Sequence, residues 1–197
     1  QAQLARAVFP LGGMKKDDVR SVARSLGLSA ADAKESQDVC FSRPGELGAT
    51  LQSEFGGAPP GGEFVDEATG RIVGRHPGVH RFTIGQRKGT GVAFGRPAWI
   101  SEIDAASGRV VLTTNPESLL RKELILPNPH WIVKPEARSF HAEAQIRYRS
   151  KPVPADVELR DDGSALVRFE TPVRAVTPGQ ATVLYDGDRL LGGAFLP

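Results

Sequence analysis

Apolar residues recur at helical spacing in one stretch near the start of the chain. Across residues 15–28, Val19, Val22 and Leu26 fall on one face of a helix, and Gly27 is well placed to end it. The pattern predicts one amphipathic helix, and two aspartates in its first turn suit the helix dipole.

A second, shorter helix is predicted over residues 45–55, where two leucines stand four positions apart. A run of glycine and proline follows at residues 56–62, and such a run fits neither the interior of a helix nor that of a strand. We therefore expect the main domain boundary in this run.

Beyond the boundary the pattern changes to short alternating strands separated by turn residues. The first predicted group comprises residues 63–66, 71–74, 80–84, 98–103 and 109–113, and the second comprises residues 123–126, 130–132, 141–148, 153–159, 165–169, 181–185 and 189–195. Short strands with tight turns favour a closed barrel, because closure removes exposed edges. The sequence thus predicts an α+β, mostly β chain with three parts, residues 1–60, 61–120 and 121–197.

The composition is that of an ordinary globular protein. Hydrophobic residues make up 40% and charged residues 24% of the chain, and no apolar run approaches the roughly 18 residues of a membrane span. The net charge of +2 is too small to indicate a nucleic-acid partner by itself. With one cysteine, no secretory signal and no initiator Met, we expect a cytoplasmic protein of which this chain is a part.

Cys40, the only cysteine, is the first candidate for chemistry. It stands in a polar stretch between Lys34 and Arg43, two cations that would stabilise a thiolate and so favour nucleophilic attack. Its direct neighbours Val39 and Phe41 also fit an inert buried thiol, and composition alone favours that second interpretation.

A glycine-rich segment, residues 80–91, is the second candidate. Its glycines and the cations Arg87 and Lys88 suit contact with a phosphate, although the spacing is not that of a nucleotide-binding loop. A β-turn with solvated charges fits the same residues equally well.

Two further segments could contact RNA. If the strand predicted at 141–148 continued, alternation would put Arg147 and Arg149 on one face and Tyr148 on the other, and such basic-aromatic ends suit an RNA backbone. Gln180 stands in a turn where its amide could reach a base or a ribose. Ordinary solvated charges and an ordinary turn are the alternatives.

The four histidines do not indicate a metal site. His76 and His80 are four positions apart, a spacing that puts two ligands on one face of a helix but not of a strand or turn. We therefore predict no metal in this chain.

Taken in order, these motifs resemble those of the tRNA-specific 2-thiouridylases. The resemblance covers essentially the whole chain and is carried above all by SQDVCF at residues 36–41, TIGQRKG at 83–89, RYR at 147–149 and TPGQ at 177–180. It implies that residues 1–60 are the tail of an α/β ATP-pyrophosphatase domain. A small central β domain and a C-terminal β-barrel like the second domain of elongation factors would follow.

The resemblance also implies an activity. In the family, ATP adenylates the C2 oxygen of the wobble uridine in tRNAs for Glu, Gln and Lys, and persulfide sulfur then displaces that oxygen. By matching position, Cys40 would carry the persulfide, received from a sulfur-relay protein or a cysteine desulfurase. Arg147, Tyr148 and Gln180 would contact tRNA, and residues 83–89 would serve the architecture and lie near the RNA.

The family's Ser-Gly-Gly-x-Asp-Ser nucleotide loop and its upstream catalytic cysteine do not occur in this sequence. ATP is therefore an expected cofactor of the whole enzyme, with its site outside this chain. The competing hypothesis is a stand-alone tRNA-binding β-barrel module that acts with a separate catalytic subunit.

Overall fold

The fold is taken from a computed structural model of the 197-residue chain, which describes residues 2–33, Thr50, Ser53 and residues 61–197. The chain divides into two compact units, residues 1–50 and residues 51–197. The predicted second helix at residues 45–55 lies outside the described residues except for Thr50 and Ser53, so it stays a prediction.

The first unit is helical. Helix α1 (Lys16–Ser25) stands between two short 3₁₀ turns, η1 (Leu4–Arg6) and η2 (Ser29–Asp32), which confirms the helix predicted within residues 15–28. Gly27 ends the helical run as predicted, because it adopts a φ of 68° and donates its N–H to the Arg24 carbonyl at 3.0 Å. The apolar face of α1 is only partly covered by the described residues of this unit, since Val19 and Ala23 are half-buried whereas Val22 is 45% and Leu26 67% exposed.

The second unit begins with a four-stranded sheet. Its strands are β1 (Gly62–Asp66), β2 (Ile72–His76), β3 (Trp99–Asp104) and β4 (Arg109–Thr113), in the order β2-β1-β4-β3. The two hairpins are antiparallel, and β1 joins them by pairing in parallel with β4. The apolar positions of these strands meet in one core, formed by Phe64, Val79, Ile100, Val110 and Leu112.

One predicted strand of this region is wrong. Residues 80–84 form no strand; instead, a 3₁₀ turn, η3 (Val79–Arg81), leads into an irregular loop. β2 ends where Pro77 follows His76, because proline has no N–H for a ladder. Phe82 then turns inward, and its ring meets that of Phe64 edge-on at 5.1 Å.

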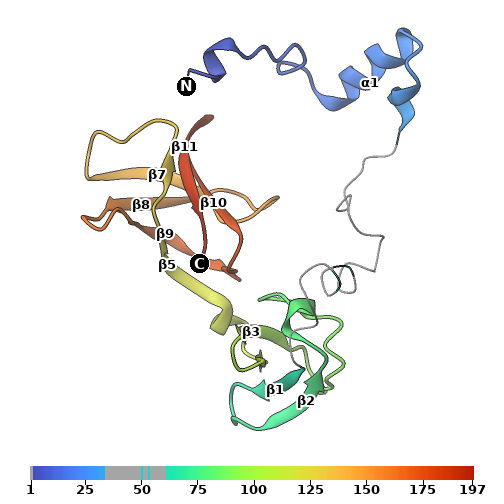
Figure 1. Ribbon diagram of the computed structural model, residues 1–197, viewed down its shortest axis with the longest axis vertical. Coiled ribbons are helices and arrows are strands. Elements are labelled where there is room, and N and C mark those ends of the chain that lie inside the picture. Colours follow the sequence, from blue (N-terminus) through green and yellow to red (C-terminus); the bar gives the residue numbers. More distant parts are fainter. Residues whose placement is uncertain (1, 34–49, 51–52, 54–60) are drawn as a thin grey trace. The chain divides into compact units, whose positions relative to one another are not determined.

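A seven-stranded antiparallel sheet forms the rest of the second unit. Its strands are β5 (Leu120–Leu126), β6 (His130–Trp131), β7 (Ser139–Gln145), β8 (Val153–Leu159), β9 (Ala165–Arg174), β10 (Ala181–Asp186) and β11 (Arg189–Phe195). The order is β5-β9-β8-β7-β10-β11-β6, and the sheet curls into a half-barrel (Figure 1). The prediction of a mostly β chain with a C-terminal barrel is confirmed.

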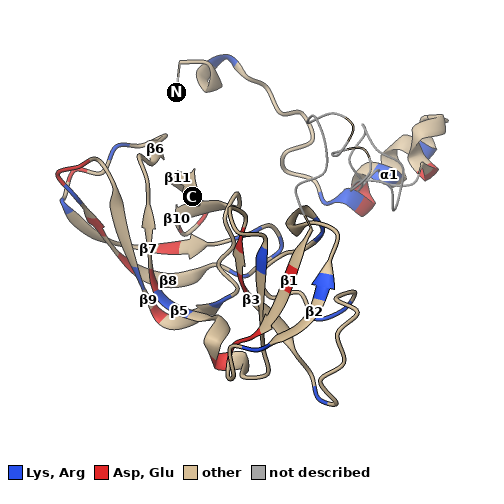
Figure 2. Ribbon diagram, turned by 60° about the horizontal axis from the view of Figure 1, so that its bottom comes forward, with Lys and Arg blue, Asp and Glu red and all other residues tan. Residues whose placement is uncertain are grey.

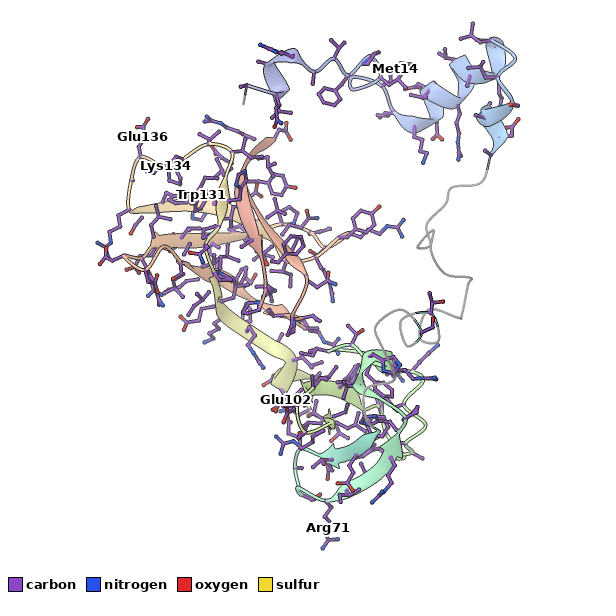
Figure 3. The ribbon with its side chains drawn as sticks, in the orientation of Figure 1. Met14, Arg71, Glu102, Trp131, Lys134 and Glu136 are labelled. Atoms are coloured by element: carbon purple, nitrogen blue, oxygen red, sulfur yellow. The ribbon has the colours of Figure 1, made fainter. Side chains whose placement is uncertain are left out.

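Alternation explains the curled sheet. On β8, Ala155 and Val157 are buried while the residue between them is exposed, and on β10 Thr182 and Leu184 are likewise buried. Trp131 of β6 is labelled in Figure 3. Its ring meets that of Phe140 of β7 edge-on, with 6.0 Å between the ring centroids. These side chains fill the inside of the curl and hold its curvature.

A short connection links the two sheets. A 3₁₀ turn, η4 (Pro116–Leu119), is capped by Asn115, whose side chain accepts the N–H of Glu117. Ser118 donates its hydroxyl to Glu67 at 2.7 Å, and Leu119 is 2% exposed. The connection is therefore fixed at both ends rather than a free linker.

Lys and Arg positions are intermixed with Asp and Glu positions over the strands of the second unit (Figure 2). Several cations are already neutralised, as where Arg168 meets both Glu158 and Glu123. Within the described part of the chain, no helix has the length and apolar character needed to cross a bilayer.

Candidate nucleic-acid interface

The basic-aromatic segment lies in a tight turn, not on a strand. β7 ends at Gln145, so the predicted continuation through Tyr148 is wrong. The backbone N–H and the hydroxyl of Ser150 both donate to the Arg147 carbonyl, at 3.2 and 2.8 Å, and Gln145 donates its side-chain amide to the Ser150 carbonyl at 2.7 Å. Arg149 adopts a left-handed φ of 63°, which a continuing strand cannot contain.

This turn presents an aromatic ring and cations together. Tyr148 is 82% exposed, and the guanidinium carbon of Arg149 lies 5.2 Å from its ring centroid. The two side chains therefore share one side of the turn, contrary to the opposite faces expected from strand alternation. Arg147 is exposed and forms no ion pair with a described residue. Such a turn can stack on a base and meet a phosphate at once.

Gln180 lies in a second turn, between β9 and β10. Its backbone is held on both sides, since its N–H donates to Thr177 at 3.3 Å and its carbonyl accepts from Leu196 at 2.9 Å. Its side chain is exposed and makes no hydrogen bond to the part of the chain that the structure describes. The amide is thus free to bind a polar group from outside.

The loop of residues 83–89 is organised by Gln86. The side-chain oxygen of Gln86 accepts the N–H of Thr83 at 3.0 Å, and its nitrogen donates to the carbonyl of Lys88 at 2.8 Å. Arg87 and Lys88 are exposed and are not ion-paired to any described residue. Gln86 therefore holds the loop together from within, and Arg87 and Lys88 are the residues of this loop that could contact a phosphate.

The structure places these candidates on separate turns. Among the described residues, no hydrogen bond, ion pair or ring contact joins Arg87 or Lys88 to Arg147 or Gln180. Cys40 lies outside the described residues, so its role stays a prediction.

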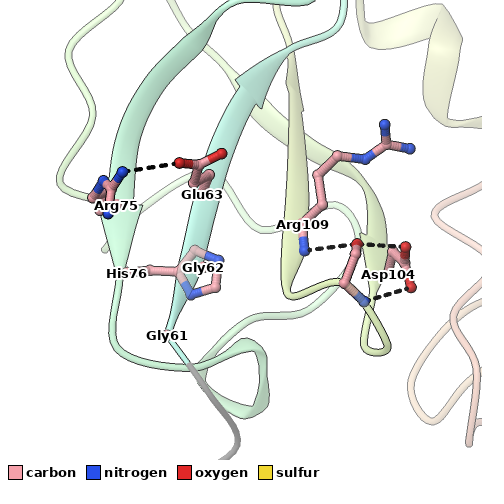
Figure 4. Close-up of a pocket in the computed structure, with 8 residues that line it drawn as sticks. Gly61, Gly62, Glu63, Arg75, His76, Asp104 and Arg109 are labelled. Atoms are coloured by element: carbon pink, nitrogen blue, oxygen red, sulfur yellow. Dashed lines mark hydrogen bonds and ion pairs between the residues drawn. The ribbon is translucent and has the colours of Figure 1, made fainter.

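A polar pocket that the sequence pattern did not predict opens at one end of the four-stranded sheet (Figure 4). It measures about 730 Å³, and its lining residues are Gly61, Gly62, Glu63, Arg75, His76, Asp104, Ser107 and Arg109. Arg75 and Glu63 form an ion pair across it at 3.1 Å. No motif marks the pocket, because residues from all four strands of the sheet and from the turn between β3 and β4 build it.

His76 is the buried member of this pocket, with 6% of its surface exposed. Its Nε2 lies 3.0 Å from the Gly108 carbonyl, so it carries the hydrogen, and its Nδ1 has no partner among the described residues. Burial lowers the pKa of His76 below its ordinary value of 6.5, and the bond to Gly108 opposes that shift only in part. The ring is therefore neutral near pH 7.

This shift predicts an acid sensitivity of the second unit. Below pH 6.5 the unfolded chain takes up a proton that folded His76 refuses, so the free energy of unfolding falls as pH drops toward the folded pKa. We expect urea unfolding of His76→Phe at pH 7 and pH 5 to show a smaller pH-dependent loss than wild type. Equal losses in the two proteins would mean that His76 titrates alike in the folded and unfolded chains.

Among the described residues, no group of three His, Cys, Asp or Glu side chains could hold a metal ion. The Ser-Gly-Gly-x-Asp-Ser nucleotide loop does not occur in this sequence.

Three family models match consecutive parts of the chain. They describe a tRNA methyl transferase HUP domain at residues 1–43, a tRNA methyl transferase PRC-barrel domain at residues 49–114 and an aminomethyltransferase beta-barrel domain at residues 121–196. The class of protein is thus a HUP-domain segment followed by two β-barrel domains.

Curated relatives match along the whole chain. The tRNA-specific 2-thiouridylases MnmA of Chlorobaculum tepidum, Geobacter metallireducens and Nostoc punctiforme are 42%, 40% and 40% identical to it. Each match covers 100% of this chain and 54%, 53% and 55% of the relative. The chain belongs to the tRNA-specific 2-thiouridylase family, and it spans about half the length of the curated relatives it matches.

Proposed function

We propose that this chain is part of a tRNA-thiolating sulfurtransferase that installs 2-thiouridine at the wobble position of tRNA. The observation that carries the proposal is the 40–42% identity to 2-thiouridylases along the entire chain. The substrates would be tRNAs for Glu, Gln and Lys, and the sulfur would come from a cysteine desulfurase or a sulfur-relay protein in the cytoplasm.

Cys40 is the proposed sulfur carrier. A thiolate at this position attacks the outer sulfur of a donor persulfide, the S–S bond of the donor breaks, the donor leaves as a thiolate, and Cys40 retains the transferred sulfur as its own persulfide. Lys34 and Arg43 flank it in sequence and favour the thiolate form. Since Cys40 is the only cysteine, the second thiol needed to release that sulfur must come from outside this chain.

Activation of the uridine by ATP belongs to the part of the relatives that this chain does not match. No residue here fits the phosphates of a nucleotide in the manner of a nucleotide loop, so we assign no step of that activation to this chain.

The second unit is the proposed tRNA-binding part. Arg147 supplies a cation without a neighbouring carboxylate, Tyr148 offers an 82% exposed ring for a base, and Gln180 offers an amide with no protein partner among the described residues. Arg87 and Lys88 would lie near the phosphate backbone and add to the attraction at long range.

Arg147→Ala should weaken tRNA binding by roughly threefold to tenfold at 0.1 M salt and reduce the slope of log affinity against log salt by about 1. The reason is that Arg147 has no carboxylate to neutralise it among the described residues. The measurement is the fluorescence anisotropy of labelled tRNA, recorded at a series of KCl concentrations from about 50 to about 300 mM.

Arg168→Ala is the matched control, because it removes the same charge from a cation already bound to Glu158 and Glu123. Its affinity should stay close to wild type. If the two variants weaken binding equally, the effect is one of net charge, and the assignment of Arg147 to the interface is wrong.

A further inference from the structure

The loop of residues 83–89 touches the segment that leads to Gln180. An ideal Cβ added to Gly85 would lie 2.6 Å from the Cβ of Ala175, closer than two side-chain carbons can approach. Gly85 also adopts a φ of 85°, which favours glycine for a separate reason. Position 85 therefore admits only glycine if this contact is to form.

The loop side of this contact is rigid. Gly85 donates its N–H to the Ile100 carbonyl at 2.7 Å, and Ile100 donates back to the Gln86 carbonyl at 3.0 Å, which ties the loop to β3. The side chain of Gln86 clamps the loop from within through Thr83 and Lys88. Gln86 thus uses its amide inside the protein rather than on a ligand.

On the side of the seven-stranded sheet, Ala175 is also held in place by its neighbours. Ala175 is 5% exposed, adopts a φ of 58° although it is not glycine, and donates its N–H to the Leu119 carbonyl at 2.9 Å. The preceding Arg174 lays its guanidinium carbon 5.2 Å from the ring centroid of Trp99 on β3. A strained residue such as Ala175 persists only where its surroundings fix it.

A continuous path runs from Ala175 to Gln180. Thr177 donates its hydroxyl to the Ala175 carbonyl at 3.0 Å, and Gln180 donates its N–H to the Thr177 carbonyl at 3.3 Å. Displacing Ala175 would therefore shift the turn that presents Gln180.

We propose that the loop of residues 83–89 is a brace that positions Gln180 for tRNA through the contact of Gly85 with Ala175. Gly85 and Gln86 are then positioning residues, which act on RNA only through the barrel. This inference rests on the proposed function of Gln180, and its test contains one readout that needs no RNA.

The test compares Gly85→Ala with Gly89→Ala. Both positions have a positive φ, of 85° and 83°, but a Cβ on Gly89 meets only the Gln86 side chain, at 3.6 Å. The strain of an alanine in the left-handed region is therefore matched, and only the contact with Ala175 differs. Arg174→Gln is a second variant that removes the ring contact without adding atoms, in case Gly85→Ala does not fold.

The first readout is amide hydrogen exchange of residues 175–180 in the whole chain without RNA. Exchange should be about tenfold faster in Gly85→Ala and close to wild type in Gly89→Ala, with Arg174→Gln shifted in the same direction. Equal exchange in the two glycine variants would overturn the brace.

The second readout is a double-mutant cycle on tRNA affinity. Gly85→Ala and Gln180→Ala should each weaken binding, and the double variant should be little weaker than Gln180→Ala alone, whereas Gly85→Ala and Arg147→Ala should add. Full additivity of Gly85→Ala with Gln180→Ala would contradict the positioning role. If Gln180→Ala alone left affinity unchanged, the proposed function of Gln180 would fail, while hydrogen exchange would still decide whether the brace exists.

Discussion

Incubation of the chain with a cysteine desulfurase and free cysteine should load one sulfur atom onto Cys40, and Cys40→Ser should load none. The expectation follows from the resemblance of the SQDVCF block at residues 36–41 to the motif of the 2-thiouridylases and from the two cations that flank the thiol in sequence. Because the chain has one cysteine, intact-mass spectrometry reads the result without ambiguity.

A reducing agent provides the control for this loading, since it should remove the added sulfur and restore the original mass. Iodoacetamide labelling gives an independent check, because a thiol with thiolate character reacts faster than a buried one. An unloaded Cys40 that is labelled no faster than a buried thiol would show the cysteine to be structural.

Gly62→Ala should destabilise the four-stranded sheet by about 3 kcal/mol. A Cβ on Gly62 would overlap the carbonyl oxygen of Gly108. That same oxygen accepts the hydrogen bond from buried His76, so moving it also breaks the only described hydrogen bond of that ring. The substitution thus lowers the free energy of unfolding in two ways, through the steric overlap with Gly108 and through the loss of the buried hydrogen bond from His76.

Urea unfolding followed by Trp99 fluorescence measures this effect. Trp99 lies on β3, and a Trp131→Phe background leaves it as the single tryptophan of the chain. Gly70→Ala is the control, because that turn glycine has a φ of 69° and nothing within 4 Å of an added Cβ; it should cost about 1 kcal/mol. A cost for Gly62→Ala no greater than that of Gly70→Ala would contradict the close approach of β1 to Gly108.

Most strands could be predicted because local rules decide them. β8 and β10 alternate buried and exposed residues, and Asp66 and Asp104 begin turns in which their carboxylates accept hydrogen bonds from Thr69 and Ser107. The parallel pairing of β1 with β4 could not be foreseen in the same way, since it joins strands that no hairpin turn connects.

The setting of the candidate residues was harder to predict than their chemistry. Alternation extended β7 through Tyr148, whereas the Gln145 side chain and the left-handed Arg149 close a turn there. The contact of Gly85 with Ala175 joins residues far apart in the sequence and leaves no periodic trace. A glycine in a turn motif indicates an unusual backbone conformation or a close contact, but it does not indicate which residue lies against it.

The three-part division at residues 60 and 120 stays a prediction, as does the role of Cys40. The division rests on the glycine-proline run at residues 56–62 and on the strand pattern as well as on the family resemblance. The role of Cys40 rests on the resemblance, because a lone thiol in a polar stretch does not distinguish a sulfur carrier from a buried side chain. The described part of the chain shows that the candidate RNA-binding residues of the second unit lie on turns held by hydrogen bonds.

The most direct test of the central claim is the 2-thiouridine content of tRNA from cells whose own copy of the gene carries Cys40→Ser. Nucleoside mass spectrometry should find wobble 2-thiouridine lost in that strain and retained in a matched Ser42→Ala strain that makes equal amounts of protein. Wild-type levels of 2-thiouridine in the Cys40→Ser strain would contradict the claim that this chain carries the sulfur.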